Sequence, residues 1–243
     1  MRPRYPDLLP RKDEQDLAND LYAIGVNLTA TAQVTDPNIE ETLVLSSIEA
    51  VNHGDHRIAG ILVDWISAHF LRINVDRLTN LVFGLSDEGF WWVKIFWCAN
   101  AQRFYPADAR FRRLAHLYRG QRLDFSDRDT PNTERPVTEI FIQMKGLDER
   151  FEATCIRVPK NAFFHRPEQV FEADWIARHH MPFRYRVMMG ASYRADLWAL
   201  LRRNPKLSGY RLAKLAHCSI AAAARVKKDY LIVKRDYSGR KAV

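Results

Sequence analysis

The sequence predicts a mostly α-helical protein that has an N-terminal helical bundle and ends in two short helices joined by a tight turn. Three observations support this fold class. Apolar residues make up 47% of the 243 positions, which is enough to build a buried core. Helical periodicity with short connections runs from residue 36 to residue 120. Two short segments with apolar faces then lie within residues 208–233, on either side of His217 and Cys218.

Five segments follow from these patterns. We expect an N-terminal arm and first helix (1–35), a helical domain for dimerisation or partner binding (36–120), a linker (121–136), an α+β connecting region (137–190) and a C-terminal two-helix segment with a basic tail (191–243). The linker is assigned from its two prolines, its charges and its few apolar residues.

The helices expected before the linker are marked by start and stop residues. Gly25 ends the first helix, and Asp36-Pro37 starts the second. Asp55 and Asn74 are placed to cap the next two. The expected spans are 12–24, 37–51, 56–70, 75–82, 88–101 and 107–118.

The span 88–101 is apolar on nearly every side. It holds Phe90, Trp91, Trp92, Phe96 and Trp97 within eight residues. Such a helix belongs in a domain centre or against a partner. We expect the core position, and we also note it as the most apolar surface available for self-association.

Beyond the linker the period changes. Residues 137–144 and 152–158 are short and rich in β-forming residues, so they predict a small β hairpin, with a helix ending at Gly146 as the alternative. A helix over 168–180, a short strand over 183–189 and a helix over 192–204 are expected next. The run from Phe183 to Arg186 alternates aromatic and cationic side chains, which can stack on bases or pack on the domain surface.

The two C-terminal helices are amphipathic. In the first, a small apolar face is formed by Leu212, Ala213, Leu215 and Ala216. Ser219 is placed to cap the second helix. At 100° per residue, one stripe of that helix holds Ala223, Val226 and Tyr230, and the opposite stripe holds Ala221, Ala224, Arg225 and Lys228.

Residues 190–233 resemble helix-turn-helix DNA-binding regulators. The preceding helix (MGASYRADLWALLRRNPKLS) is followed by YRLAKLAH and SIAAAARVKKDY. Ala213 lies where the two helices cross, and the apolar pattern of the motif is matched by Leu212, Cys218, Ala223 and Val226. His217 departs from the motif, because Gly usually occupies that turn position. Residues 231–233 can start a wing strand, although the ten residues that follow are too few for a full wing hairpin.

The helix RADLWALL is similar to regulators that accompany nucleotidyltransferase-type toxins in bacterial toxin–antitoxin pairs. The resemblance implies a transcriptional regulator, antitoxin-like and without catalysis, that binds double-stranded DNA.

The charge distribution points to the same segment. From Leu201 onward twelve Lys and Arg face two Asp, a net +10, whereas the whole chain is +8. Residues 1–200 therefore sum to −2. A localised positive excess suits a phosphate backbone, and a flat stripe with cations suits a major groove. The predicted DNA-binding residues are Ser219, Ala221, Ala224, Arg225, Lys227, Lys228, Arg211, Lys214, Lys234 and Arg235.

We also expect a homodimer. One copy of the outward stripe offers few groups that read bases, and a symmetric dimer doubles them. The predicted interface lies in the N-terminal helical region, which could also hold a different protein partner.

Catalytic and metal-binding patterns are not found. His53 and His56 lack two further ligands at zinc spacing. The carboxylates Asp124, Asp127, Asp129 and Glu134 lack the Gly and terminal Glu of a calcium loop. No glycines fall at phosphate-loop spacing. We predict no catalytic residue, no metal and no cofactor. Two alternatives stay open: an interaction protein whose helix-turn-helix only packs, and a metal-dependent nucleic-acid-processing enzyme that uses the carboxylate-rich loop.

The cellular setting is inferred from the cysteines and the apolar runs. Cys98, Cys155 and Cys218 are widely spaced and are expected to be free thiols in a reducing compartment. No apolar run is long enough to span a bilayer, and the first residues have no signal-peptide core. We expect a cytoplasmic protein without membrane contact.

Overall fold

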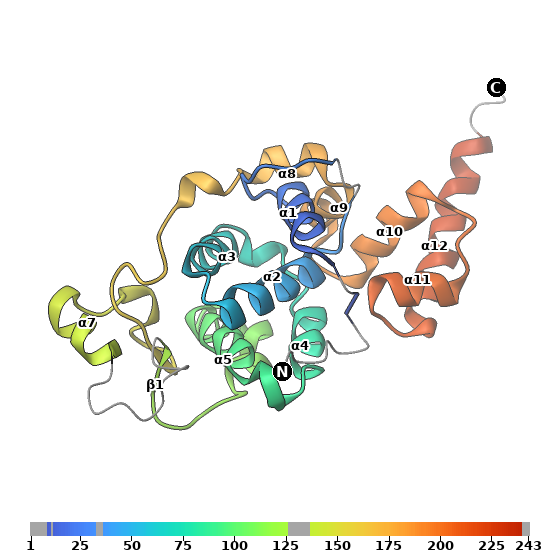
Figure 1. The fold of residues 1–243 in the computed structure, drawn as a ribbon. Coiled ribbons are helices and arrows are strands. Elements are labelled where there is room, and N and C mark those ends of the chain that lie inside the picture. Colours follow the sequence, from blue (N-terminus) through green and yellow to red (C-terminus); the bar gives the residue numbers. More distant parts are fainter. Residues whose placement is uncertain (1–8, 11, 33–35, 126–136, 240–243) are drawn as a thin grey trace.

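The protein is mostly helical, as predicted (Figure 1). The computed structural model describes residues 9–10, 12–32, 36–125 and 137–239. The α-helices in these residues are α1 (Glu14–Ala23), α2 (Ile39–His53), α3 (His56–His69), α4 (Val75–Phe83), α5 (Asp87–Phe104), α6 (Arg112–Ala115), α7 (Val137–Lys145), α8 (Ala173–His179), α9 (Met181–Met189), α10 (Tyr193–Arg203), α11 (Gly209–Ala216) and α12 (Ile220–Gly239).

Several predicted helix boundaries are confirmed by their caps. The Asp55 carboxylate accepts hydrogen bonds from Arg57 N and Ile58 N, both at 3.0 Å, at the start of α3. The Asn74 side chain accepts from Arg77 N at 3.2 Å at the start of α4. Each cap satisfies backbone N–H groups that have no partner within the helix. The predicted helix 107–118 is shorter, consisting of a 3-10 turn (Ala109–Phe111) and the single turn of α6.

One continuous core joins most of the chain, and we call the described residues 9–190 the helical body. Helices α2, α3 and α5 lie at its centre (Figure 1). Trp65 and Trp97 are fully buried, and their indole N–H groups donate to Ile24 O (3.0 Å) and Ser47 Oγ (2.8 Å). The same core includes Phe163 and Phe183, so residues beyond the predicted linker pack on the same apolar cluster.

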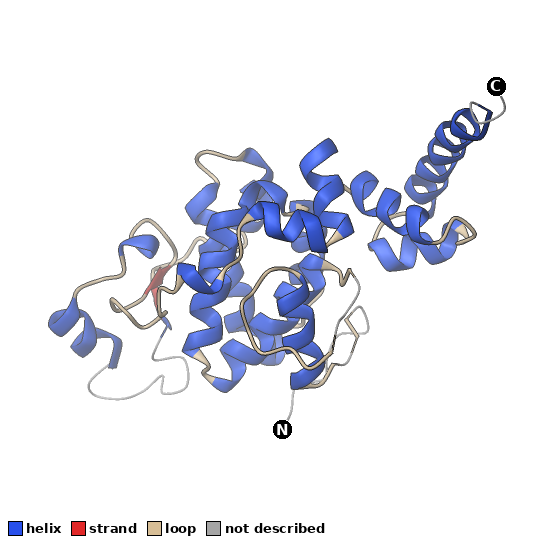
Figure 2. Ribbon diagram, turned by 90° about the horizontal axis from the view of Figure 1, so that it is seen from above, coloured by secondary structure: helices blue, strands red, loops and turns tan. Residues whose placement is uncertain are grey.

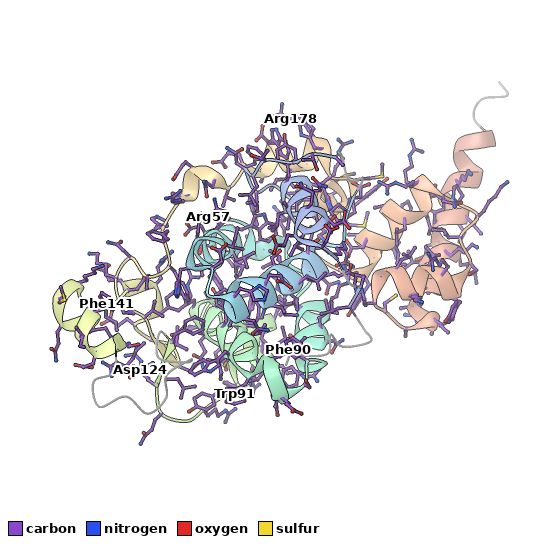
Figure 3. All side chains as sticks on the ribbon, in the orientation of Figure 1. Arg57, Phe90, Trp91, Asp124, Phe141 and Arg178 are labelled. Carbon is purple, nitrogen blue, oxygen red and sulfur yellow. The ribbon has the colours of Figure 1, made fainter. Side chains whose placement is uncertain are left out.

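Helix α5 takes the core position. Phe90, Phe96 and Trp97 are each at most 1% exposed, and Trp91 is 36% exposed. Phe90 and Trp91, which are labelled in Figure 3, lie near the start of α5. Most of the large apolar side chains of this helix are therefore used inside the chain, whereas Trp91 stays partly accessible.

The predicted β hairpin is wrong. Residues 137–144 form helix α7, which ends before Gly146 at φ +82, as the alternative prediction had it. The sheet consists of two short parallel strands, β1 (Leu123–Asp124) and β2 (Ile156–Arg157), with Leu123 paired to Ile156. The strands are far apart in the sequence, and a tight turn cannot join parallel strands. Most of the predicted linker, 126–136, lies outside the described residues.

The segment before α10 also differs from the prediction. Residues 183–189 belong to helix α9 instead of a strand. Its Phe183 and Arg186 are both buried, and three residues is a helical spacing. The helix predicted over 168–180 is a 3-10 turn (Pro167–Gln169) followed by α8.

Helices α10 to α12 form a second unit, which we call the C-terminal module. The module lies on the side of the body opposite the small sheet (Figure 2). Its own core consists of eight residues: Leu197, Leu201, Leu212, Ala213, Ala216, Ala223, Val226 and Tyr230. Helix α12 continues through 231–233 to Gly239, so the predicted wing strand is wrong.

Candidate nucleic-acid interface

The two helices of the predicted motif have the expected caps. Ser208 Oγ accepts from Arg211 N at 3.1 Å at the start of α11. Ser219 Oγ accepts from Ala222 N at 3.1 Å at the start of α12, which is the capping role assigned to Ser219 from the sequence. A serine cap of this kind contributes about 1 kcal/mol to helix stability.

The turn between the helices depends on one residue in a left-handed conformation. His217 has φ 49° and ψ 45°. Cys218 N donates back to Ala213 O at 3.0 Å, which closes the end of α11. A non-glycine residue pays a conformational penalty here, of about 1 kcal/mol or more. The His217 ring is 2.9 Å from a carboxylate oxygen of Glu41 on α2, so this turn residue also contacts the body.

Small side chains let α11 and α12 pack closely. Ala213 and Ala216 on α11 are buried, as are Ala223 and Val226 on α12. The predicted inward stripe is therefore confirmed, with Tyr230 completing it 5.2 Å from the Trp198 ring of α10. Arg194 of α10 also pairs with Asp229 of α12 at 2.7 Å. The outward stripe must consequently face solvent.

The outward face of α12 is small and cationic. Ser219, Ala221, Ala224, Arg225 and Lys228 are all exposed. Within the described residues, the Arg225 guanidinium and the Lys228 ammonium have no hydrogen-bond or ion-pair partner. Ile220 at the first helical position is 57% exposed. A ligand that binds this face would therefore meet two long cationic side chains, Arg225 and Lys228, surrounded by small alanine side chains.

The other predicted DNA-binding residues lie in different places and differ in exposure. Lys227 is half-buried and donates to Leu207 O at 2.6 Å, which fastens the loop between α10 and α11. Arg211 and Lys214 are exposed on α11 and line a cavity of about 750 Å³ between the module and the body. Lys234 is exposed further along α12, and the side chain of Arg235 lies outside the described residues.

A buried cluster of four charges holds the module on the body, and the sequence did not predict it. Glu40 (α2), Arg77 (α4), Arg186 (α9) and Asp196 (α10) are almost completely inaccessible to solvent. Arg186 binds Glu40 with two hydrogen bonds (2.6 and 2.8 Å) and Asp196 with two more (2.8 Å each). Arg77 Nη1 lies 3.0 Å from Glu40 and 2.6 Å from Asp196. Two carboxylates and two guanidinium groups thus neutralise each other.

The electrostatics of the cluster keep its members charged. Burial would raise the pKa of Glu40, but Arg186 and Arg77 together hold the pKa below its ordinary value. The pKa of Asp196 is lowered against burial by the same two arginines. Burial also opposes the charge of Arg186, yet Asp196 and Glu40 raise its pKa. The cluster is accordingly a set of paired ions whose partners cannot be removed singly without leaving a buried charge.

The same cluster reaches the motif itself. Arg77 Nε donates to Ala216 O at 2.9 Å, so a body residue caps the last turn of α11. Cations are favourable at that end of a helix. Together with the contact between Glu41 and His217, this fixes the turn that orients α12. In the run from Phe183 to Arg186, Arg186 serves this docking and Phe183 packs in the core of the body. Both side chains are buried and cannot stack on bases.

The carboxylate loop gains no support as a metal centre from the described residues. Asp124 pairs with Arg157 at 3.4 Å, at the far end of the molecule from the module (Figure 3). Asp127, Asp129 and Glu134 lie outside the described residues. His53 pairs with Glu49 at 3.0 Å, whereas the His56 ring lies against Phe163. Across the part of the chain that the structure describes, no three His, Cys, Asp or Glu side chains converge as metal ligands.

Comparisons with known proteins leave the site to be judged from its geometry. No family model, no curated protein and no solved structure matches this chain. Among the described helices, none combines the length and apolar character needed to cross a membrane.

Proposed function

We propose that this protein is a DNA-binding transcriptional regulator that uses the outward face of α12 to bind double-stranded DNA. The observation that carries the proposal is the pair of exposed cations, Arg225 and Lys228, which have no partner among the described residues and lie among Ala221 and Ala224 on the outward face of α12. A recognition helix needs little bulk near the groove floor and long donors that reach base edges or phosphates. The proposal includes a cytoplasmic setting and an antitoxin-like role beside a nucleotidyltransferase-type toxin.

Charge supports the same proposal. The segment from Leu201 onward carries +10, and the rest of the chain carries −2. Double-stranded DNA attracts such a segment without sequence preference, and base contacts then add specificity. Arg225 is the best candidate for a base contact, since an arginine can bind guanine O6 and N7 with two hydrogen bonds. Lys228 is the best candidate for a phosphate contact.

The geometry also favours a regulator over a free DNA-binding tail. Glu41 and Arg77 contact His217 and Ala216, so the turn before α12 is held by the body. A ligand or partner that moved α2 or α4 would shift the orientation of α12. Two copies of the chain are needed for enough base contacts, and we propose a homodimer that binds half-sites about one helical turn apart, or a multiple of that distance.

The test is binding to the best sequence selected from the DNA upstream of the protein's own gene. Arg225→Ala should weaken specific binding by about 1–3 kcal/mol. Arg202→Ala is the matched control, because it removes the same charge from an exposed position of α10. Equal losses of affinity in the two variants would show that Arg225 acts only through its positive charge and makes no specific base contact. Sedimentation equilibrium of the free and DNA-bound protein checks the homodimer, and a monomer in both states would contradict it.

One observation favours a second function, the binding of an acidic protein. Helix α12 also exposes Ile220 (57%), Leu231 (40%), Ile232 (55%) and Val233 (47%). Large exposed apolar side chains beside cations are common in protein interfaces. Affinity for unrelated DNA separates the two functions. A DNA-binding face predicts that the logarithm of the affinity falls linearly with the logarithm of salt concentration. No binding to unrelated DNA at low salt would favour the protein partner.

A further inference from the structure

The cavity between the helical body and the C-terminal module is lined by residues of both parts. The body contributes residues of α2, α4 and α9, and the module contributes residues of α10 and α11. Its volume of about 750 Å³ lies in the usual range of small-molecule sites. Beside it, Asn38 Nδ2 donates to Leu215 O at 3.5 Å and the His217 ring contacts Glu41. The cavity therefore exists only in the docked molecule, and neither part forms it alone.

The carboxylates of the lining are already paired within the chain. Each of the four has a basic partner: Asp20 pairs with Lys12, Asp36 with Arg203, Glu41 with His217, and Asp196 with Arg77 and Arg186. Because their negative charges are used in these pairs, the carboxylates are poorly placed to attract a cationic ligand.

Two cations of the lining have no such partner. Arg211 and Lys214 are three residues apart on α11, so they lie on the same side of the helix. Both are exposed and both line the cavity. Within the described residues, neither the guanidinium nor the ammonium group has a hydrogen-bond or ion-pair partner. The charges of the lining that remain for a ligand are therefore positive.

A further donor belongs to the body side of the lining. Arg77 lines the cavity, and its Nε and Nη1 atoms bind Ala216 O, Glu40 and Asp196. Its Nη2 atom is buried and has no hydrogen-bond partner among the described residues. A buried donor without an acceptor is unfavourable, and a negative charge in the adjacent cavity would reduce this cost through its electric field.

The rest of the lining is apolar and stiff. It includes four large aliphatic side chains and three prolines: Leu9, Ile39, Leu200, Leu215, Pro10, Pro37 and Pro182. Proline restricts the backbone, so these parts of the wall need little reordering when a ligand binds. Apolar walls with a few polar groups are the usual composition of a small-molecule site, and they favour a ligand that has an apolar part.

We propose that this cavity binds a small organic anion whose carboxylate or phosphate group is held by Arg211 and Lys214, with its apolar part against the aliphatic wall. The planar guanidinium group can bind either acidic group with two parallel hydrogen bonds, and the ammonium group adds a second positive charge. The ligand would contact the body and the module at once, and it would therefore strengthen their docking.

The site does not depend on DNA binding by α12. Its use as a signal rests on the proposed function: a bound anion would neutralise Arg211 and Lys214, two of the cations predicted to contact DNA, and would hold α11 against the body. A regulator of this kind would respond to a small acidic metabolite.

The experiment is a titration of the full ¹⁵N-labelled chain with benzoate and phenyl phosphate, at constant pH and ionic strength and without DNA. Saturable shifts of backbone amide signals are expected in residues 36–41, 182–186 and 208–217, with a Kd on the order of 1 mM for ligands of this size. The tighter of the two probes identifies the preferred acidic group. Benzamide, which has the ring without the charge, should bind at least about tenfold more weakly. No saturable shift with either anion up to about 10 mM would overturn the proposal.

Three matched variants locate the anion. Arg211→Gln and Lys214→Gln should each weaken binding of the better probe about tenfold. Arg202→Gln removes a charge from an exposed position of α10 outside the lining, and it should leave the Kd unchanged. Wild-type affinity in both α11 variants, or an equal loss in Arg202→Gln, would overturn the proposal. Since DNA is absent, such a failure would leave the proposed DNA binding by α12 standing, and a chain that binds no DNA could still bind the probes.

Discussion

The helical body and the C-terminal module are stabilised by different interactions. Within the described residues, the body buries 43 hydrophobic residues in one continuous cluster, whereas the module buries eight in its own. Three helices with so small a core are marginal on their own. The module is instead stabilised by docking, through two carboxylates and two guanidinium groups that join it to α2, α4 and α9.

This difference shows how a basic unit can be attached to a nearly neutral body while Arg225 and Lys228 stay exposed. The cluster is neutral as a whole, so it adds no net charge to the molecule. Arg77 and Glu41 approach the turn from the body side and leave the opposite face of α12 uncovered. Apolar packing alone would need a large face of the module, and it would not discriminate between orientations as paired ions do.

The largest effect is expected from the removal of one partner of the charge cluster. Asp196→Ala leaves Arg77 and Arg186 with Glu40 as the only carboxylate of the cluster, and we expect about 3–5 kcal/mol of destabilisation. The module should separate from the body, which would show as two unfolding transitions in urea. Asp229→Asn is the control, since its pair with Arg194 is partly exposed and should contribute less than about 1 kcal/mol. A single transition with a small shift would mean that the cluster does not hold the module.

A matched pair of cavity mutations tests whether the two cores unfold independently. Leu212→Ala and Leu62→Ala each remove a fully buried side chain, from the module and from the body. Each should cost about 2–5 kcal/mol. Amide hydrogen exchange should accelerate only in α10 to α12 for Leu212→Ala, but throughout the body for Leu62→Ala. Equal acceleration everywhere in both variants would show one cooperative unit.

Acid should weaken the body through two buried histidines. His180 Nδ1 accepts from Phe183 N (3.1 Å) and Nε2 donates to Pro37 O (2.9 Å), so the neutral ring has both partners. Burial lowers the pKa of His180 and of His69. The unfolded chain then binds more protons than the folded one below the ordinary value of 6.5. Stability is therefore lost as the pH falls through this value, by at most about 1.4 kcal/mol per pH unit for each histidine.

Urea unfolding between pH 7 and pH 5.5 measures this effect. His180→Gln should reduce the pH dependence, because one of these two buried histidines is removed. An unchanged pH dependence in this variant would contradict the explanation.

The smallest effect is expected at the turn of the motif. His217→Gly removes the left-handed strain and also the contact with Glu41, so the two changes should nearly cancel. His217→Ala removes the contact and keeps the strain. We expect the alanine variant to be less stable than the glycine variant by about 1 kcal/mol. Thermal unfolding of both variants measures the difference, and equal stability would show that the turn is not strained.

Local signals in the sequence were sufficient for several of the helices and their caps. Asp55, Asn74 and Ser219 were identified as caps from side-chain chemistry and position alone. The inward stripe of α12 followed from a period of 3.6 residues. These features depend on neighbours within one or two helical turns, so the sequence contains all of the information that they require.

The secondary structure predicted from local signals was wrong in segments where tertiary contacts determine the conformation. Residues 137–144 are β-rich but form α7, and residues 231–233 look like the start of a wing strand but continue α12. β propensity is a weak preference that other interactions readily override, and a strand also needs a pairing partner. In the segment 183–189, the burial of Phe183 and Arg186 against the body favours the helix over the alternation that the sequence suggested.

Four features could be predicted from the sequence: the helical class, several caps, the amphipathic pattern of the last two helices and the concentration of positive charge after residue 200. The tertiary structure alone brought Glu40, Arg77, Arg186 and Asp196 into one buried cluster. These four residues have no regular spacing in the sequence that would predict the cluster. A charged residue in a helix normally indicates a solvated face, and only the fold places a partner close enough to make its burial favourable.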